Sequence, residues 1–221
     1  MSPLTNLRKL AVSLAMFAVV TLASATLARA DTVTFDLNRG STLPNQNYGT
    51  ITLTLNGSGG IDVSISLLAG NRIVNTGFDA SVAFNSTLGG TIGVTGLPGT
   101  YTLVNGGVPG DIDMDGFGSF DYGVLFNAQG GGAGTDSTLT FTVTRTGGFS
   151  TVFELVQNST NPPGSFQSPF AVDIICDSCG PATGVVGTGT PNPGTPEPAS
   201  MVLLGSGLLG LAAGIRRRLR K

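Results

Sequence analysis

Short runs in which apolar and polar residues alternate one by one recur through the middle of this 221-residue chain. A period of two places one face of a strand on a core and the other in water, which suits antiparallel sheets. Gly, Pro and Asn separate the runs, and no stretch between them has the periodicity of a helix. The sequence therefore predicts an all-β domain at residues 31–179, an antiparallel β-sandwich of the jelly-roll kind. The clearest runs cover residues 33–37, 50–55, 61–67, 120–126 and 138–144, and weaker runs lie at 80–85, 91–95, 100–105, 150–157 and 169–176.

The polar sides of these runs are rich in Thr, and no Lys occurs between residues 31 and 198. Lysine on edge strands is a common protection against strand pairing between molecules. Its absence leaves the edges of the sheet poorly guarded, so self-association is one of the interactions that we expect.

The first 30 residues have the three parts of a secretory signal peptide. Arg8 and Lys9 form a positive start, residues 10–22 are apolar, and residues 28–30 read Ala-Arg-Ala before Asp31. Small residues at that spacing suit signal peptidase, which favours cleavage over an uncleaved membrane helix. The sequence therefore predicts an exported chain that begins at Asp31.

The C-terminal end has a second set of three parts. Residues 180–198 consist mostly of Gly, Pro and Thr, a composition typical of an extended linker. Residues 199–215 carry no charge and are long enough, at about 1.5 Å per residue, for one transmembrane helix. Residues 216–221 are mostly Arg and Lys and are expected to remain in the cytoplasm.

The order of these features from Pro196 to Lys221 resembles the PEP-CTERM sorting signal. Pro196, Glu197 and Pro198 stand before the apolar span and the terminal Arg run, whereas Thr195 replaces the Val that is common before the tripeptide. The resemblance implies processing by an exosortase-type enzyme of the inner membrane in bacteria that make exopolysaccharide. It implies a membrane-anchored precursor that later reaches the cell surface or the extracellular matrix, and says nothing about the preceding fold.

Charge and composition exclude several function classes. Residues 31–198 contain thirteen Asp and Glu against three Arg, a formal charge of −10 that makes nucleic-acid binding improbable. The chain has no His, which excludes a Ser-His-Asp triad and histidine metal ligands. A hydrolase would have to use carboxylates, but the chain has no Trp and only three Tyr to hold a sugar. We therefore expect a protein that is not an enzyme; the carboxylates weighed for a hydrolase are Asp111, Asp113, Asp115, Asp121 and Glu154.

Asp111, Asp113 and Asp115 are followed by Gly116, which matches the first half of a calcium-binding loop. Position 12 of that motif would be Tyr122 rather than a bidentate Glu. An acidic turn before a strand is the alternative interpretation, and no other cofactor is indicated. If calcium does bind, a calcium-dependent carbohydrate-binding module is the second functional hypothesis.

Cys176 and Cys179 are the only cysteines of the chain. In an exported protein they are expected to form a small structural disulfide, which we place where the last strand meets the linker.

Taken together, these features give the first functional hypothesis, an exported, surface-sorted protein with a structural or interaction role in the cell envelope or the exopolysaccharide matrix.

Overall fold

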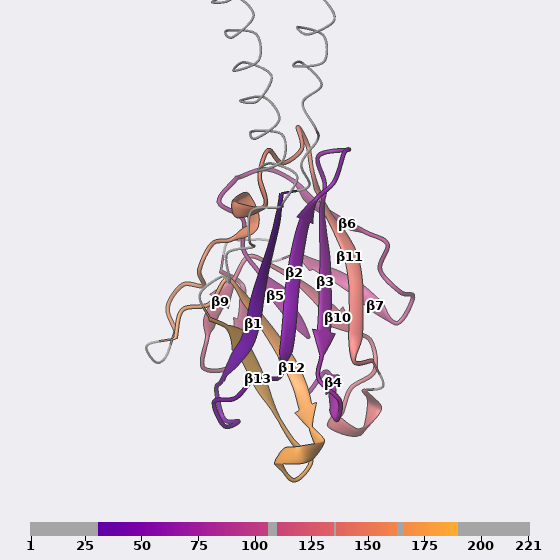
Figure 1. Ribbon diagram of the computed structural model, residues 1–221, viewed down its shortest axis with the longest axis vertical. Helices are drawn as coiled ribbons and strands as arrows, with labels where there is room; N and C mark the ends of the chain where they lie inside the picture. Colours follow the sequence, from indigo (N-terminus) through magenta and orange to yellow (C-terminus); the bar gives the residue numbers. More distant parts are fainter. Residues whose placement is uncertain (1–30, 106–109, 135, 163–165, 190–221) are drawn as a thin grey trace, which may run out of the picture.

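The computed structural model describes residues 31–105, 110–134, 136–162 and 166–189 (Figure 1). These ranges are built from antiparallel strands and three short 3₁₀ helices, so the prediction of an all-β domain is confirmed. The helices are η1 (Gly131–Ala133), η2 (Val152–Leu155) and η3 (Asp177–Cys179). The strands are β1 (Thr32–Gly40), β2 (Gly49–Leu55), β3 (Ile61–Leu67), β4 (Asn71–Ile73), β5 (Val82–Phe84), β6 (Ile92–Thr95), β7 (Tyr101–Asn105), β8 (Ile112–Met114), β9 (Gly118–Phe120), β10 (Tyr122–Phe126), β11 (Thr138–Arg145), β12 (Phe170–Cys176) and β13 (Ala182–Thr188).

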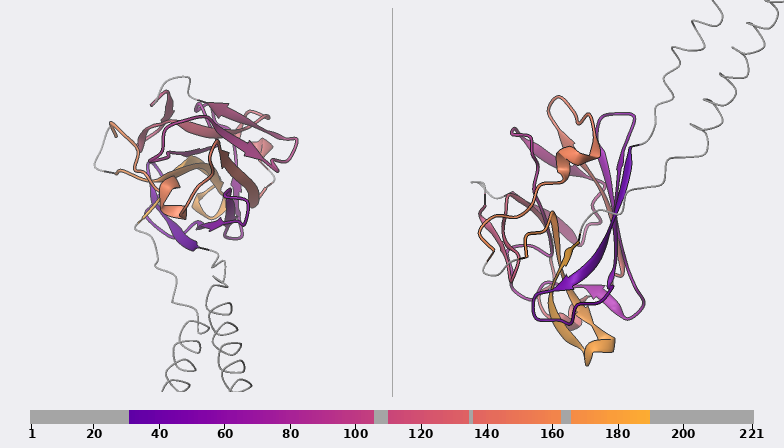
Figure 2. Two further views of the ribbon diagram at one scale, coloured as in Figure 1. Left: turned by 90° about the horizontal axis from the view of Figure 1, so that it is seen from above. Right: turned by 60° about the vertical axis from the view of Figure 1, so that its left-hand side comes forward.

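Hydrogen bonds join eleven of these strands into one sheet rather than the two separate sheets of a sandwich. The order is β6-β11-β3-β2-β1-β13-β12-β5-β10-β7, with β4 also paired to β12, while β8 and β9 form a small second sheet. The large sheet curls so that its two halves face each other, with the early strands as one wall (Figure 2, right). The predicted sandwich is therefore correct in that two layers of strands pack face to face. It is wrong in that both layers belong to one continuous sheet.

Strand β13 is the reason for this continuity, because it pairs with β1 on one side and with β12 on the other. It lies inside the segment predicted as a linker, so the prediction that the linker begins at residue 180 is wrong. The Gly- and Thr-rich composition of this segment is typical of a linker, but the segment forms a buried strand. Val185 and Val186 are fully buried on opposite faces of the strand, and Gly187 lets Phe117 approach the backbone. The folded domain reaches at least residue 189, and the remaining linker lies outside the described residues.

The main hydrophobic core fills the space between the two halves of the sheet. Phe35 of β1 meets Phe170 of β12 at 5.9 Å between ring centroids, and Phe84 of β5 meets Phe141 of β11 at 6.2 Å. These pairs cross from one half to the other and add to the stability that area burial provides.

A second, smaller core covers the outer face of β5, β12 and β13. The hairpin of β8 and β9 supplies its large residues, Ile112, Met114, Phe117 and Phe120. Every residue of β12 is consequently buried, because this strand has a core on both of its faces.

Several predictions concern residues outside the described ranges: the signal peptide at 1–30, the transmembrane helix at 199–215 and the basic end at 216–221. Within the described ranges, no helix has the length and apolar character needed to cross a membrane. The run at 150–157 was expected to be a strand but contains the 3₁₀ helix η2, whose Val152 and Leu155 join the main core.

Candidate functional site

The outer face of the wall formed by β1, β2, β3 and β11 is covered by hydroxyl groups. Strand register aligns its side chains into three rows that run across the four strands. We call these twelve residues the hydroxyl face: Asp36, Thr50, Ser66 and Thr138 in the first row, Thr34, Thr52, Ser64 and Thr140 in the second, and Thr32, Thr54, Asp62 and Thr142 in the third.

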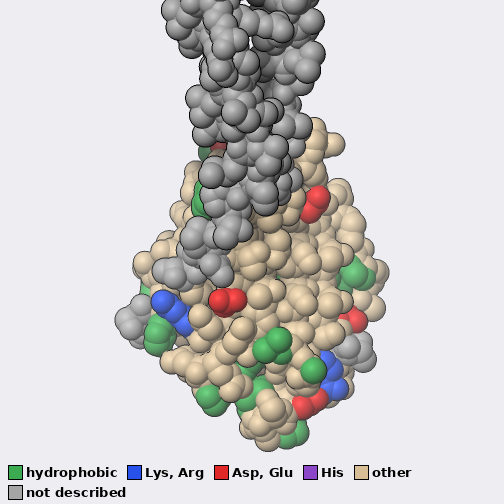
Figure 3. Space-filling model, in the orientation of Figure 1, with side chains coloured by type: hydrophobic (Ala, Val, Ile, Leu, Met, Phe, Trp, Pro, Cys, Tyr) green, Lys and Arg blue, Asp and Glu red, His purple; other side chains and the backbone are tan. Residues whose placement is uncertain are grey.

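Each of the twelve side chains is exposed or half-buried, whereas the residues between them along the strands are buried in the main core. Ten of the twelve carry a hydroxyl group and none is basic or apolar. The space-filling view looks onto this wall and shows mainly tan surface in its middle, with a few acidic side chains, while hydrophobic and basic side chains lie mostly toward the lower end and the sides (Figure 3). The hydroxyl face is therefore a broad polar surface with little charge.

Neighbouring side chains of the hydroxyl face bind each other. The Oγ1 atoms of Thr34 and Thr52 lie 3.1 Å apart, and those of Thr32 and Thr54 lie 3.2 Å apart. The hydroxyl of Thr142 donates to Oδ1 of Asp62 at 2.7 Å. These cross-strand bonds limit the rotamers of the hydroxyl groups, so the surface is partly preorganised.

A shallow hollow of about 240 Å³ crosses the second and third rows. Its lining comes mainly from the hydroxyl face, with Gly96 at the end nearest β6. Because hydroxyl groups both donate and accept, such a hollow can hydrogen-bond a polyhydroxylated ligand in either direction.

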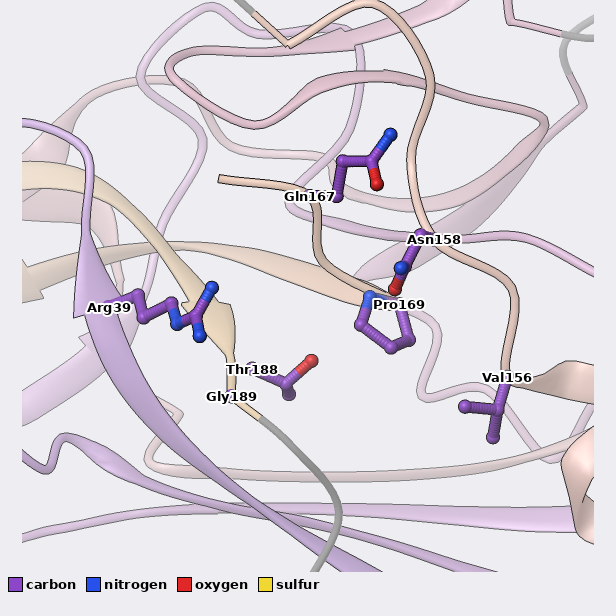
Figure 4. A pocket seen from close by; sticks show the side chains of 7 residues that line it. All are labelled: Arg39, Val156, Asn158, Gln167, Pro169, Thr188 and Gly189. Atoms are coloured by element: carbon purple, nitrogen blue, oxygen red, sulfur yellow. The ribbon is translucent and has the colours of Figure 1, made fainter. Parts of the chain in front are cut away.

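A larger pocket of about 420 Å³ lies where β1 and β13 meet residues 156–158 and 167–169 (Figure 4). Among the described residues that line it, Arg39 is the only charged one. In β1, Leu37 pairs with Thr188 and Arg39 pairs with Gly187, so Asn38 is an extra residue in the strand. This bulge turns Arg39 away from the main core, where strict alternation after Leu37 would have placed it. The described lining residues are Arg39, Val156, Asn158, Gln167, Pro169, Thr188 and Gly189.

The guanidinium of Arg39 lies over the ring of Phe166, 5.8 Å from its centroid, and has no ion pair or hydrogen bond with another described residue. The other two arginines of the described part are engaged. Arg72 pairs with Asp177 at 2.8 Å, and Arg145 donates to the carbonyl groups of Gly89 and Gly148.

Hydrogen bonds hold the described residues that flank this pocket. The Ser159 amide donates to the Ser168 carbonyl, and the Ser168 amide donates to Oγ of Ser159. The amides of Thr160 and Ser119 each donate to the carbonyl of the other. A Cβ at Gly118 would lie 2.2 Å from the Thr160 carbonyl oxygen, so this approach needs glycine. These bonds, three between backbone groups and one to the Ser159 hydroxyl, fix the described residues on this side of the pocket.

Asp173 is a fully buried carboxylate in the middle of β12. Desolvation raises its pKa to about 6, although Oδ2 accepts hydrogen bonds from the amide and the hydroxyl of Thr76, both at 2.7 Å. Oδ1 is buried without a hydrogen-bond partner among the described residues. Sequence analysis did not single out this residue, although a lone charge within the apolar run at 170–176 was a usable signal.

The structure does not gather Asp111, Asp113 and Asp115 into one cluster. Among the described residues there is no group of three His, Cys, Asp or Glu side chains that could hold a metal ion. The three side chains are exposed along the β8–β9 hairpin, where the Phe117 amide donates to the Met114 carbonyl and Gly116 has a φ of +78°. This geometry is that of a tight turn whose third position requires glycine.

The remaining carboxylates weighed for a hydrolase support local backbone. Oδ1 of Asp121 accepts from the Gly110 amide at 2.8 Å, and Oε2 of Glu154 accepts from the Ser150 amide at the same distance.

Cys176 and Cys179 form a disulfide, with an S–S distance of 1.99 Å. It closes the turn between β12 and β13 rather than a junction with the linker, because another strand follows it. Gln46 donates from Nε2 to Sγ of Cys179 at 3.5 Å. The arrangement ties the β1–β2 connection to this hairpin.

Comparison with known proteins finds one similarity. Residues 194–218 match the family model of the PEP-CTERM protein-sorting motif. The match includes Pro196, Glu197 and Pro198, so the resemblance noted in the sequence is confirmed. No curated protein and no solved structure matches this chain.

Proposed function

We propose that this chain, a PEP-CTERM protein that is exported and sorted to the cell surface, has a structural or interaction role in the cell envelope or the exopolysaccharide matrix. An exosortase-type enzyme processes the precursor at the sorting motif, and the β domain is then left outside the inner membrane. In this proposal the domain acts by binding polysaccharide and not by catalysis.

The observation that carries the proposal is the hydroxyl face. Its three rows extend across four strands and present hydroxyl groups without basic or apolar side chains. Sugar units are themselves rich in hydroxyl groups, so each contact can be made with the surface group as donor or as acceptor. Many weak contacts of this kind along one polymer chain add up through multivalency.

Co-sedimentation of the full-length protein with an insoluble neutral glucan tests this function. A bulky charge in the middle of the face should prevent close contact, so we expect Thr140→Arg to reduce the bound fraction several-fold. Thr140 is exposed in β11, next to Ser64 in the second row.

Thr102→Arg is the matched control, because Thr102 is also an exposed strand threonine but lies in β7. Equal binding by wild type, Thr140→Arg and Thr102→Arg would refute a role for the hydroxyl face. Melting temperatures of both variants equal to that of the wild type would show that both are folded.

A further inference from the structure

We propose that the pocket around Arg39 binds the carboxylate of an acidic sugar residue, a uronic acid. This inference rests on the proposed function and deepens it, because it adds one sugar class, the uronic acids, to what the domain binds in a polysaccharide.

The charge of the pocket is the first argument. Arg39 is the only charged residue among the seven described residues that line the pocket, so no carboxylate of this described lining opposes an anion. The described part of the chain is otherwise acidic, and its other two arginines are bound to Asp177 or to backbone carbonyl groups. The pocket is therefore a local site for a negative charge on a domain that repels anions elsewhere.

The second argument is that the guanidinium of Arg39 is available to bind a carboxylate. Its contact with Phe166 positions the group but leaves its N–H donors free of described partners. A guanidinium is planar and binds a carboxylate through two parallel hydrogen bonds. The bulge at Asn38 is what directs this side chain outward, and it is fixed by the register of β1 against β13.

The remaining lining residues suit a sugar ring better than a small inorganic anion. Asn158 and Gln167 carry side-chain amides that have no hydrogen bond with described residues, and they can bind ring hydroxyl groups. Val156 and Pro169 add apolar surface for the C–H side of the ring, opposite Arg39 (Figure 4). The volume of about 420 Å³ lies within the range of ordinary small-molecule sites.

Calorimetric titration of the full-length protein with trigalacturonate tests the inference, in a nonionic detergent that contains no sugar. We expect saturable binding, and we expect the methyl-esterified trimer, which lacks the charge, to bind about tenfold more weakly or worse. Arg39→Gln should abolish the preference for the acid, and Arg39→Lys should retain only part of it because the planar fork is lost.

Arg72→Gln is the matched control, because it removes an arginine that lies in a surface ion pair outside the pocket. It should leave trigalacturonate binding unchanged. Equal affinity for the acid and the ester, or equal binding by wild type and Arg39→Gln, would overturn the inference.

Glu197 follows Gly189, the last described residue and part of the pocket wall, in the sequence, so the chain's own carboxylate is an alternative occupant that needs a test. Glu197→Gln should leave the affinity for trigalacturonate unchanged. An increase in affinity would show that the tail carboxylate competes with trigalacturonate for this pocket, which would still support a carboxylate site at Arg39.

These outcomes are separable from those of the proposed function. If Arg39→Gln no longer binds trigalacturonate while Thr140→Arg still binds the neutral glucan, the uronic-acid site is supported and the role of the hydroxyl face is refuted. If Thr140→Arg no longer binds the glucan while the wild type does not bind trigalacturonate, the role of the hydroxyl face is supported and the uronic-acid site is refuted.

Discussion

Burial of Asp173 should make the protein more stable as the pH falls from 7.5 to 5. The pKa of this carboxyl is raised from 3.8 in the unfolded chain to about 6 in the fold, because desolvation penalises the charged form. The stabilising contribution of the protonated group is therefore fully present below about 3.8 and is lost as the pH rises through about 6. The difference between these pKa values corresponds to about 3 kcal/mol of stability.

About 1–2 kcal/mol of this contribution should be gained between pH 7.5 and 5. The chain has no His, so no imidazole titrates in the same range and obscures the change. Urea denaturation at several pH values measures it, and the midpoint should rise by roughly half a molar or more for a typical urea slope.

Asp173→Asn removes the titration and should make stability nearly independent of pH in this range. The amide nitrogen that takes the place of Oδ1 would be a buried donor without a partner, which costs about 1–3 kcal/mol. The slope with pH, rather than the stability at one pH, is therefore the informative quantity. Asp36→Asn, on the half-exposed hydroxyl face, is the matched control and should retain the wild-type slope. A flat wild-type profile, or a slope that survives in Asp173→Asn, would refute the reasoning.

Three further perturbations have defined outcomes. Gly187→Ala should destabilise the domain by about 1–3 kcal/mol in urea denaturation, because a Cβ there would lie 2.2 Å from the ring of Phe117. Gly132→Ala, where a Cβ would meet nothing within 4 Å, should not, and an equal loss in both would contradict this packing. Reduction of the Cys176–Cys179 disulfide should cost about 2 kcal/mol, the value expected for so short a loop, and an unchanged unfolding midpoint under reducing conditions would argue against a stabilising role. Millimolar calcium added after chelator treatment should leave the melting temperature unchanged, since Asp111, Asp113 and Asp115 do not converge; a ligand at a hundredfold its Kd would add about 2.7 kcal/mol and would restore the calcium hypothesis.

The strands with strict alternation were predictable from the sequence because one of their faces is solvated. This holds for β1, β2, β3 and β11, which together form the wall that carries the hydroxyl face. Alternation identifies the outward side of each strand but not its partner. The three rows of the hydroxyl face depend on register between strands that are distant in sequence, so only the structure shows them.

Strand β13 was missed for a different reason. Its Gly and Thr residues resemble a linker in composition, whereas in the fold glycine permits the close approach of Phe117. The strands β4 and β8 have three residues each, too few for a pattern. The bulge that turns Arg39 into its pocket depends on the pairing of β1 with β13, which are distant in sequence. The residues around Arg39 alone therefore did not predict it.

The intact mass of the protein recovered with the surface polysaccharide tests the central claim most directly. The account predicts a species that begins at Asp31, lacks the terminal Arg cluster and is enriched in the polysaccharide fraction. A species that retains Lys221 and is found only in the inner membrane would contradict both sorting to the surface and a role in the matrix.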